Sequence, residues 1–537
     1  MVKNTQDPFF NKSTAFTSSE RINLGLIGTL PAIVHTMEEQ LEVEYLKIKS
    51  QIDDASKSRY LLSLYNVNRV LYFALIRKYV KELLPLIYTP TIAENVIHFS
   101  SSYLWNNDAL YLDSDYPAEI ETALKNATKD MDNVDLMVIT DGEGVLGIGD
   151  WGINGLMISL GKMSVYTIAA GINPKSILPV IIDNGTNRQN LLESKVYLGK
   201  KQERVNNENY LQYLDKFVEV SNQLYPNVLF HWEDFGRGTA QTILDRYSDE
   251  FVTFNDDIQG TGITVVAAVN NALKMKNETY EDQKFVIFGA GTAGIGISEQ
   301  LKNDMVNQGL SEKEARKKIY LVDKDGLIID FQINLTKGQR CFARDSKEFL
   351  DKPSLLEDII EMVQPSFLIG VSGQANAFNK KIIKSMLSYQ KNPAIFPLSN
   401  PSKLAEASAA EILEWTNGEG LVVTGSPSEP VQYGENIYHI GQANNALFYP
   451  GLGLGIVTSK ASKVTNGMLA AAARSVLRDS EPQKLGASLL PKIEDLCECS
   501  ITVAKAVFLA AIKEGVSNFE EKDFTEQLSK KVWEARY

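Results

Sequence analysis

The chain has 537 residues, of which 44% are hydrophobic and 23% are charged, and its formal net charge is −13. This length predicts two to four structural units, and the composition is typical of a globular protein. The acidic balance disfavours nucleic acid and anionic membrane surfaces as partners. An acidic substrate would need local help from a metal ion, a lysine or helix N-termini.

Targeting and redox features are sparse. The three cysteines, Cys341, Cys497 and Cys499, form no disulfide framework, so reduced structural thiols are expected. The start of the chain has neither the apolar run of a secretion signal nor an arginine-rich amphipathic pattern. The longest uncharged run, residues 436–459, is broken by Gly, Asn and Pro and cannot be a membrane span. We therefore expect a cytoplasmic protein.

The hydrophobic pattern changes along the chain. Residues 36–80 show helical periodicity, whereas residues 136–259 contain short apolar runs that end in Gly, Asp or Asn, which is typical of parallel strands. A helix at 262–274 then leads into a strand at 285–288, and a C-terminal helical segment is expected from about residue 459. These features predict an α/β protein with two domains. Residues 1–256 would form a helical entry and an α/β substrate and metal domain, and residues 257–537 a Rossmann-type NAD-binding domain.

Two acidic turns follow short apolar runs in the first predicted domain. Glu233 and Asp234 follow the run at 227–230, and Asp256 and Asp257 follow the run at 251–254. The carboxylates are therefore expected at strand ends, where clustered carboxylates bind a hard divalent cation through oxygen.

A glycine loop opens the second predicted domain. Gly289, Gly291 and Gly294 fit the dinucleotide-binding pattern between a strand and a helix. Asp323 ends the next predicted strand, where an acid can bind the adenosine ribose, and this favours NAD over NADP. The interval from Gly294 to Asp323 is longer than usual, which a longer helix through residue 303 and a loop to residue 318 would explain. Two later strand-end loops, 367–373 and 395–401, are predicted to face the same cofactor.

The chain has only four histidines, so Lys and Tyr become the natural acid–base candidates. Lys162 lies inside the apolar run 156–165, and Tyr88 lies in a turn just before Pro90. From residue types alone, a tyrosine in the position of Tyr88 is more often structural than catalytic, whereas for Lys162 the two roles are about equally frequent.

Many motifs resemble those of the malic enzyme family, and they occur in the family's order from about residue 11 nearly to the end of the chain. They lie at residues 11–17, 24–31, 88–91, 140–150, 161–162, 233–235, 255–260 and 399–401.

The resemblance implies roles for these residues. Tyr88 would be the general acid and Lys162 the general base, with Asp256 beside Lys162. Glu233, Asp234 and Asp257 would bind Mn²⁺ or Mg²⁺. The carboxylates of L-malate would be bound by Asn400 and Asn445, and Asn444 would lie near the nicotinamide. The resemblance gives His231 no ligand role, and we interpret it as a packing residue. It also implies a homodimer or homotetramer.

One departure from the family pattern concerns the substrate. Malic enzymes carry an arginine after Asp-Gly-Glu that binds the substrate carboxylate, and this chain has Gly144 there. A bidentate arginine is not replaceable by glycine. The variant is similar to the malolactic branch of the family, which converts L-malate to L-lactate and CO₂ with NAD and Mn²⁺ and without net NADH release.

Three alternatives stay open. The chain could be an NAD-dependent malic enzyme that releases pyruvate, CO₂ and NADH, or a dehydrogenase of a related 2-hydroxy acid. It could also be a non-catalytic NAD-binding sensor, although such a protein would be expected to lack some of Lys162, Tyr88 and the carboxylates.

Overall fold

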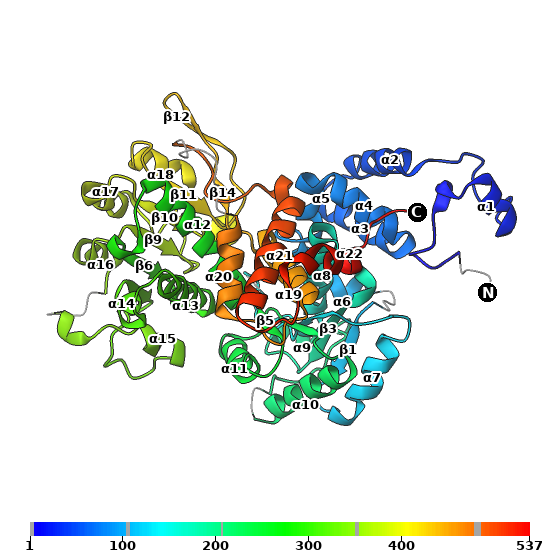
Figure 1. Ribbon diagram of the computed structural model, residues 1–537, viewed down its shortest axis with the longest axis horizontal. Helices are drawn as coiled ribbons and strands as arrows, with labels where there is room; N and C mark the ends of the chain where they lie inside the picture. Colours follow the sequence, from blue (N-terminus) through cyan, green and yellow to red (C-terminus); the bar gives the residue numbers. More distant parts are fainter. Residues whose placement is uncertain (1–4, 104–107, 146, 206–207, 350–353, 477–484) are drawn as a thin grey trace. The chain divides into compact units, whose positions relative to one another are not determined.

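The computed structural model describes residues 5–537 except 104–107, 146, 206–207, 350–353 and 477–484. The chain forms two compact units (Figure 1). Unit 1 comprises residues 1–143, 150–228 and 526–537, and unit 2 comprises 144–149 and 229–525. The predicted domain boundary near residue 257 stays a prediction. The long segment of unit 2 begins at residue 229.

Unit 1 begins with the predicted helical region. Some of its helices are preceded by a side chain that accepts a hydrogen bond from a free backbone N–H group. Thr36 and Glu39 form a capping box before α2, and Asp53 caps α3. The helices of unit 1 are α1 (Ser18–Asn23), α2 (Met37–Lys49), α3 (Asp54–Val67), α4 (Arg69–Lys78), α5 (Val80–Ile87), α6 (Ile92–Ser102), α7 (Ile120–Ala127), α8 (Leu156–Ala170), α9 (Gln189–Leu192) and α10 (Glu208–Leu224), and α22 (Phe524–Lys531) ends in it.

The strands of unit 1 are parallel, with β3 between the other two. They are β1 (Leu110–Asp113), β2 (Leu136–Thr140) and β3 (Ile177–Asp183). Every residue of β2 and β3 is buried, and α8, which packs on both strands, is buried along its whole length. The side chain of Lys162 therefore lies in a helix that has no exposed face.

Unit 2 contains a parallel strand pair and a seven-stranded sheet of order β14-β11-β10-β9-β6-β7-β8. Neighbouring strands of this sheet pair in parallel, except β7 with β8. The pair is β4 (Leu229–Trp232) with β5 (Thr253–Asn255). The sheet contains β6 (Phe285–Phe288), β7 (Ile319–Asp323), β8 (Gly326–Leu327), β9 (Phe367–Gly370), β10 (Ala394–Pro397), β11 (Leu421–Thr424) and β14 (Gly441–Gln442), and β12 (Val431–Tyr433) forms a hairpin with β13 (Asn436–Tyr438).

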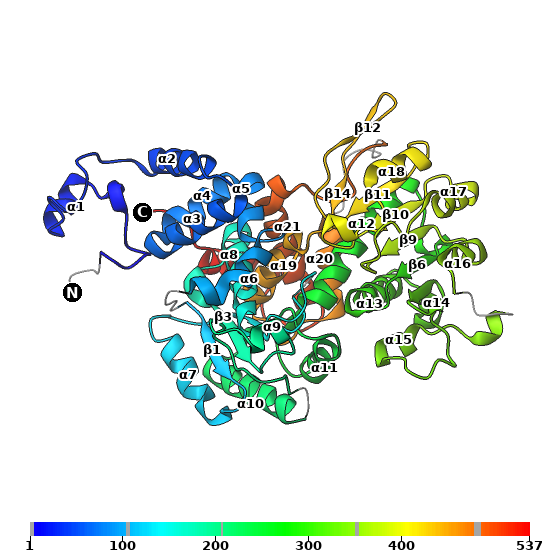
Figure 2. The same ribbon diagram turned by 180° about the vertical axis from the view of Figure 1, so that it is seen from behind.

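Both faces of the central strands are covered. Val286 and Phe288 of β6 belong to a core cluster with residues of α16, α17 and α18, whereas Phe285 and Ile287 point to the opposite face and are also buried. Figure 2 shows these helices around the sheet. The helices of unit 2 are α11 (Arg237–Tyr247), α12 (Thr261–Lys276), α13 (Thr292–Asn307), α14 (Glu312–Lys317), α15 (Lys337–Phe342), α16 (Leu356–Val363), α17 (Lys380–Tyr389), α18 (Ala409–Trp415), α19 (Tyr449–Ser459), α20 (Asn466–Ser475) and α21 (Leu496–Lys513).

Two segments differ from the sequence expectation. The interval before Asp323 contains a second helix, α14, whose Ser311 and Glu314 form a capping box, in place of the expected loop. The glycine-rich stretch after Asn444 forms the buried helix α19, although helix was expected only from about residue 459. A Cβ on Gly451 would lie 2.5 Å from the carbonyl oxygen of Ser500 in α21, so the glycines permit the close packing of these two helices.

The three cysteines are free thiols, as expected. Burial raises the pKa of Cys499 to about 12. Within the described ranges, none of the helices combines the length and the apolar character needed to cross a bilayer.

Candidate active site

The two acid–base candidates meet inside unit 1. Tyr88 is the residue that ends α5, and Lys162 lies in the middle of α8. The Lys162 side chain is 2% exposed, and its Nζ lies 5.5 Å from the centre of the Tyr88 ring. A cation at this distance is attracted by the electron-rich face of the ring. The structure thus brings together the two acid–base candidates, whose catalytic roles stay predictions.

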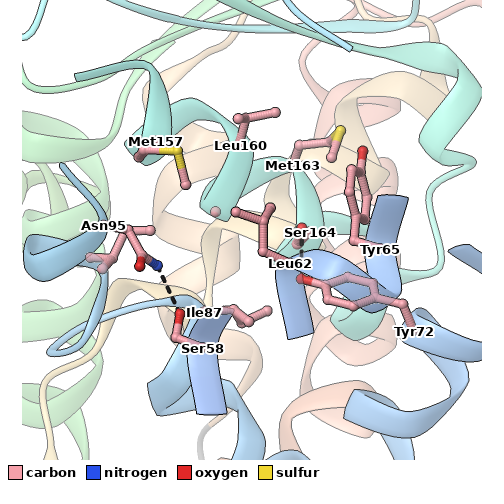
Figure 3. A pocket seen from close by; sticks show the side chains of 12 residues that line it. Ser58, Leu62, Tyr65, Tyr72, Ile87, Asn95, Met157, Leu160, Met163 and Ser164 are labelled. Atoms are coloured by element: carbon pink, nitrogen blue, oxygen red, sulfur yellow. Dashed lines mark hydrogen bonds between the residues drawn. The ribbon is translucent and has the colours of Figure 1, made fainter. Parts of the chain in front are cut away.

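An apolar pocket lies next to this pair (Figure 3). Its wall includes Ile87 and Gly161, the chain neighbours of Tyr88 and Lys162. A hydrogen bond of 2.9 Å from Asn95 to Ser58 closes one side. The other lining residues are Leu62, Tyr65, Tyr72, Ile92, Met157, Leu160, Met163 and Ser164. The wall is mainly apolar, and its hydroxyl and amide groups belong to Ser58, Tyr65, Tyr72, Asn95 and Ser164.

A buried arginine holds both ends of the loop that contains the Asp-Gly-Glu motif. Arg204 donates Nε–H to Asp150 at 2.9 Å and Nη2–H to the Asp141 carbonyl oxygen at 2.7 Å. Burial opposes ionisation of Asp150, but hydrogen bonding and charge from Arg204 outweigh it and hold its pKa below the usual range. Arg204 therefore fixes the two points, next to residues 143 and 150, at which the chain leaves and re-enters unit 1.

The two acidic turns lie side by side in unit 2. Strands β4 and β5 pair in parallel, with Trp232 opposite Asn255, so their carboxyl ends meet at one edge. Glu233, Asp234 and Asp257 each offer an oxygen atom, and these atoms lie within 4.8 Å of one another. The Asp234 backbone adopts a positive φ of 55° and donates its N–H to Asp257 Oδ2 at 2.8 Å. Three gathered carboxylates fit a hard divalent cation such as Mn²⁺ or Mg²⁺.

His231 packs against aromatic neighbours and also contacts a carboxylate of the first acidic turn. The ring is fully buried and edge-on to Phe254 and Tyr449, and its Nε2 lies 3.2 Å from Glu233 Oε2. Because an ionised carboxylate only accepts hydrogen bonds, the ring nitrogen donates here. His231 therefore orients a carboxylate of the metal cluster.

Asn445 is bound to the second acidic turn. Its Nδ2 donates to Asp256 Oδ2 at 3.1 Å, and its Oδ1 accepts from Thr264 at 3.3 Å. Asn444 instead caps its own turn by accepting the N–H of Ala446 at 3.0 Å. The substrate role predicted for Asn445 and the cofactor role predicted for Asn444 stay predictions.

Gly144 lies against the first acidic turn. Its N–H donates to the carbonyl oxygen of Asp234 at 2.8 Å, and a Cβ on Gly144 would lie 2.5 Å from the carbonyl oxygen of Phe235. This distance is too short for a real carbon atom. A side chain at position 144 therefore requires the first acidic turn to move.

The glycine loop has the form that dinucleotide binding requires. Gly289 adopts a φ of +115°, and a Cβ there would lie 2.5 Å from the Val371 carbonyl oxygen. A Cβ on Gly294 would lie 1.9 Å from the Gly289 carbonyl oxygen, so both positions require glycine. The nearest atoms to a Cβ on Gly291, which starts α13, are those of the Arg237 guanidinium at 3.7–3.8 Å. A pyrophosphate can approach the backbone there.

Two residues that sequence reasoning missed join Asp323 to this loop. Gln339 donates to Asp323 Oδ2 and to the Ala290 carbonyl oxygen, both at 3.0 Å. Arg237 also donates to the Ala290 oxygen, and its Nη2 lies 3.6 Å from Asp323 Oδ2. Arg237 directly follows the Glu-Asp-Phe-Gly turn at the start of α11, which is the only sequence signal that could have pointed to it.

Asn400 ends the loop after β10. Its Oδ1 accepts a hydrogen bond from Ser426 at 2.5 Å, and its carbonyl oxygen lies 3.6 Å from a Cβ built on Gly147. The predicted residues of unit 2 thus gather at the carboxyl ends of parallel strands, where open α/β sheets bind ligands. Tyr88 and Lys162 are placed by unit 1.

Comparisons with known proteins agree with this description. Residues 65–248 match the family model "Malic enzyme, N-terminal domain", and residues 258–512 match "Malic enzyme, NAD binding domain". A malolactic enzyme of Leuconostoc mesenteroides is 44% identical over 99% of this chain and 98% of its own length. NAD-dependent malic enzyme 3 of Bacillus subtilis is also 44% identical, over 98% and 94%. The crystal structure of a malic enzyme from Entamoeba histolytica shares the fold with a TM-score of 0.58, at 19% identity over 95% of this chain and 91% of that one.

The chain belongs to the malic enzyme family. This membership confirms the predicted α/β fold with a helical N-terminal region and a Rossmann-type NAD-binding domain. It also confirms the prediction of an NAD-dependent enzyme that decarboxylates malate.

Proposed function

We propose that the protein is a malolactic enzyme, which converts L-malate to L-lactate and CO₂ with NAD and Mn²⁺ and releases no net NADH. The observation that carries this proposal is the absence of a side chain at Gly144. With a Cβ excluded by the Phe235 carbonyl oxygen, this position contributes no guanidinium to the substrate. The similarity to malolactic enzymes of several bacteria supports the same choice.

The proposed chemistry assigns one proton transfer to each residue of the acid–base pair. Lys162 takes the proton of the C2 hydroxyl while the C2–H hydride leaves, and Tyr88 protonates C3 after CO₂ has departed. Glu233, Asp234 and Asp257 would hold the metal, and Asn400 and Asn445 would bind the carboxylates of the substrate. When bound, the metal supplies Lewis acidity and the dinucleotide supplies reversible hydride transfer. Pyruvate that stays bound would take the hydride back at C2 while Lys162 returns its proton to the C2 oxygen, which gives lactate.

The alternative is an NAD-dependent malic enzyme that releases pyruvate, CO₂ and NADH. The relative from Bacillus subtilis carries this name at the same identity, and a mitochondrial NAD-dependent malic enzyme of Saccharomyces cerevisiae is 40% identical over 96% of the chain. The two activities consume the same substrate and differ only in the fate of pyruvate and NADH.

A product assay separates them. Purified protein is incubated with L-malate, NAD⁺ and Mn²⁺, NADH absorbance is followed, and lactate and pyruvate are quantified. The proposal expects one lactate per malate without accumulating NADH. Pyruvate with an equal amount of NADH would show the alternative instead.

Position 144 is tested by Gly144→Arg with Gly144→Ala as the matched control. Alanine adds only the Cβ that collides with the Phe235 oxygen, whereas arginine adds the guanidinium as well. If the missing guanidinium separates the two activities, Gly144→Arg releases more pyruvate and NADH than Gly144→Ala. Equal product ratios in the two variants would assign the choice to other residues.

We also propose a cytoplasmic homo-oligomer, a homodimer or homotetramer. Large apolar side chains on the N-terminal part of unit 1 are exposed, and Ile27 and Ile52 are 71% and 97% exposed. Exposed apolar patches are typical of protein interfaces. Light scattering of the wild type and of Ile27→Glu with Ile52→Glu tests this, and an unchanged mass in the variant would place the interface elsewhere.

A further inference from the structure

Glu406 is a buried carboxylate that no motif of the sequence singled out. It lies before α18, and its side chain has no exposed surface. Its Oε1 accepts hydrogen bonds from the Ser372 backbone N–H at 2.9 Å, from the Ser372 hydroxyl at 2.8 Å and from the Ser399 hydroxyl at 2.5 Å. Its Oε2 accepts from the Ser399 N–H at 3.3 Å. One carboxylate thus joins the loop after β9 to the loop after β10.

The carboxylate also fixes the direction of the hydrogen bonds in both loops. An ionised carboxylate accepts only, so the two serine hydroxyls must donate to it. Their lone pairs are then free to accept backbone N–H groups. Ser399 Oγ accepts from Gly373 at 2.8 Å, and Ser372 Oγ accepts from Gln374 at 3.0 Å. An amide at position 406 would present an NH₂ group to donors and break this pattern.

The surrounding backbone is built around the same group. Phe378 donates its N–H to the Glu406 carbonyl oxygen at 2.9 Å. A Cβ on Gly370, the last residue of β9, would lie 2.5 Å from Glu406 Cδ. The strand end therefore leaves room for the carboxyl group and for nothing larger.

The two loops that Glu406 joins are those that approach the dinucleotide loop and the predicted substrate residue. Val371, next to Ser372, packs its carbonyl oxygen against Gly289, where a Cβ would lie 2.5 Å away. Asn400 directly follows Ser399. A shift of either serine is therefore transmitted through one peptide unit to Gly289 or to Asn400.

Fold stability alone is a poor reason for this arrangement. In the described part of the chain, Glu406 contacts hydroxyl and amide groups and forms no ion pair. Burying a charge costs free energy that hydrogen bonds offset only when the geometry is good, and an apolar side chain avoids that cost. The carboxylate provides orientation, because four donors must converge on it.

We propose that Glu406 is a positioning residue that fixes the Ser372 and Ser399–Asn400 loops for the bound dinucleotide. It touches neither cofactor nor substrate and acts through the two serines. The part of the proposal that concerns NADH depends on the NAD-binding domain alone. The part that concerns L-malate rests on the proposed function, because Asn400 binds substrate only in that proposal.

The test measures NADH affinity of the full chain by fluorescence titration in the absence of malate. Glu406→Gln keeps the size of the side chain and is expected to weaken NADH binding about tenfold. The control is Asp304→Asn. Asp304 is also buried and accepts hydrogen bonds from Asn270 and Tyr280 at 2.9 and 3.1 Å, but it forms an ion pair with Arg474 as well and joins helices instead of strand-end loops. The control is expected to keep NADH affinity within about twofold of the wild type, whatever its loss of thermal stability.

Two results would overturn the proposal. One is wild-type NADH affinity in folded Glu406→Gln, and the other is an equal loss in Asp304→Asn, which would make general destabilisation the cause. If Glu406→Gln does not fold, Ser372→Ala and Ser399→Ala decide, since each removes one donor, and unchanged NADH affinity in both would equally reject the proposal. A wild type that makes pyruvate would contradict the proposed function and leave this comparison of NADH affinities intact.

Discussion

Lys162 and Tyr88 carry the proposed proton transfers, and both belong to unit 1, whereas the dinucleotide loop belongs to unit 2. Their removal should therefore separate turnover from cofactor binding. We expect Lys162→Ala and Tyr88→Phe to lower kcat by about 10²–10⁴-fold each, which is the usual contribution of acid–base groups. NADH affinity should stay close to that of the wild type. Steady-state kinetics and fluorescence titration check both expectations.

Tyr72→Phe is the control for Tyr88→Phe. Tyr72 is buried in the same helical layer, and its hydroxyl lies 3.4 Å from Ser164 Oγ. Its removal should change stability more than kcat. Near-normal kcat in Lys162→Ala or Tyr88→Phe would remove the role assigned to that residue.

His231 also acts through a single contact, because one ring nitrogen lies beside Glu233, a candidate metal ligand. His231→Phe keeps the aromatic contacts with Phe254 and Tyr449 and removes the hydrogen bond to Glu233. Partners of metal ligands typically contribute 10–100-fold in affinity, so we expect Mn²⁺ binding to weaken by about that factor. A Mn²⁺ titration followed by electron paramagnetic resonance measures it.

His231→Gln should lose less Mn²⁺ affinity, because it retains an N–H donor. Unchanged affinity in His231→Phe would return the residue to the packing role that the sequence suggested. Complete loss of binding would indicate direct ligation, since His231, Glu233 and Asp256 also form a cluster that could hold an ion.

The candidate site residues predicted from the sequence are those whose signal is local. Acidic pairs after apolar runs and glycines between a strand and a helix can be recognised within a few residues, and the structure places them at strand ends. Glu406, Arg204 and Gln339 have no such signal, because each acts on residues 34, 63 or 49 positions away. Their importance arises only when the fold brings distant loops together.

At the scale of elements, helix α8 lies close to the end of α5, next to Tyr88, and one glycine of α8 permits this close packing. A Cβ on Gly161 would lie 3.0 Å from the Ile87 carbonyl oxygen and 3.4 Å from Ile92 Cδ1. Gly161→Ala should therefore displace the end of α5, and with it Tyr88, and we expect kcat to fall about tenfold. Alanine favours a helix over glycine by about 1 kcal/mol, so a loss of helicity would not be the cause.

Ser164→Ala is the control, because Ser164 lies one turn further along α8 and lines the same pocket. It removes one hydroxyl and adds no atom, so kcat should be nearly unchanged. Wild-type kcat in Gly161→Ala would show that the end of α5 accommodates the added methyl group without displacing Tyr88.

The strands were the elements most readily predicted from sequence. The predicted strand at 285–288 coincides with β6, because a run of four apolar residues bounded by Lys and Gly leaves little choice. Helix α19 was missed over its own length, since Gly451, Gly453 and Gly455 have low intrinsic helix propensity. Its stability comes from tertiary contact with α21, whose backbone approaches too closely for any larger residue at Gly451.

At the scale of the whole molecule, the chain changes units four times, and unit 1 is completed only by the last twelve residues. The net charge of −13 makes binding of an anionic substrate depend on local positive charge, which the proposed metal would supply. The discontinuous order also means that the compact units are not separated by a single cut along the chain. Segments 144–149 and 526–537 are too short for the sequence pattern to show which unit they belong to.

The C-terminal segment therefore predicts a stability effect far from the site. The Trp533 ring packs edge-on against Phe73 with ring centres 5.7 Å apart. The backbone N–H of Trp533 donates to the Gly171 carbonyl oxygen at 2.7 Å, and the Tyr537 hydroxyl donates to Gln40 at 2.8 Å. Deletion of residues 532–537 removes all three contacts and should lower the free energy of unfolding of unit 1 by about 2–4 kcal/mol. Urea unfolding followed by circular dichroism measures this.

Glu534→Ala is the control for the deletion, because this side chain is exposed and pairs with its neighbour Arg536 at 2.9 Å. Such a surface ion pair contributes about 0–1 kcal/mol, so the urea midpoint should hardly move. NADH affinity should also survive the deletion, since the dinucleotide loop lies in unit 2. Loss of NADH binding together with stability would mean that the two units unfold as one, and that the end of the chain stabilises both.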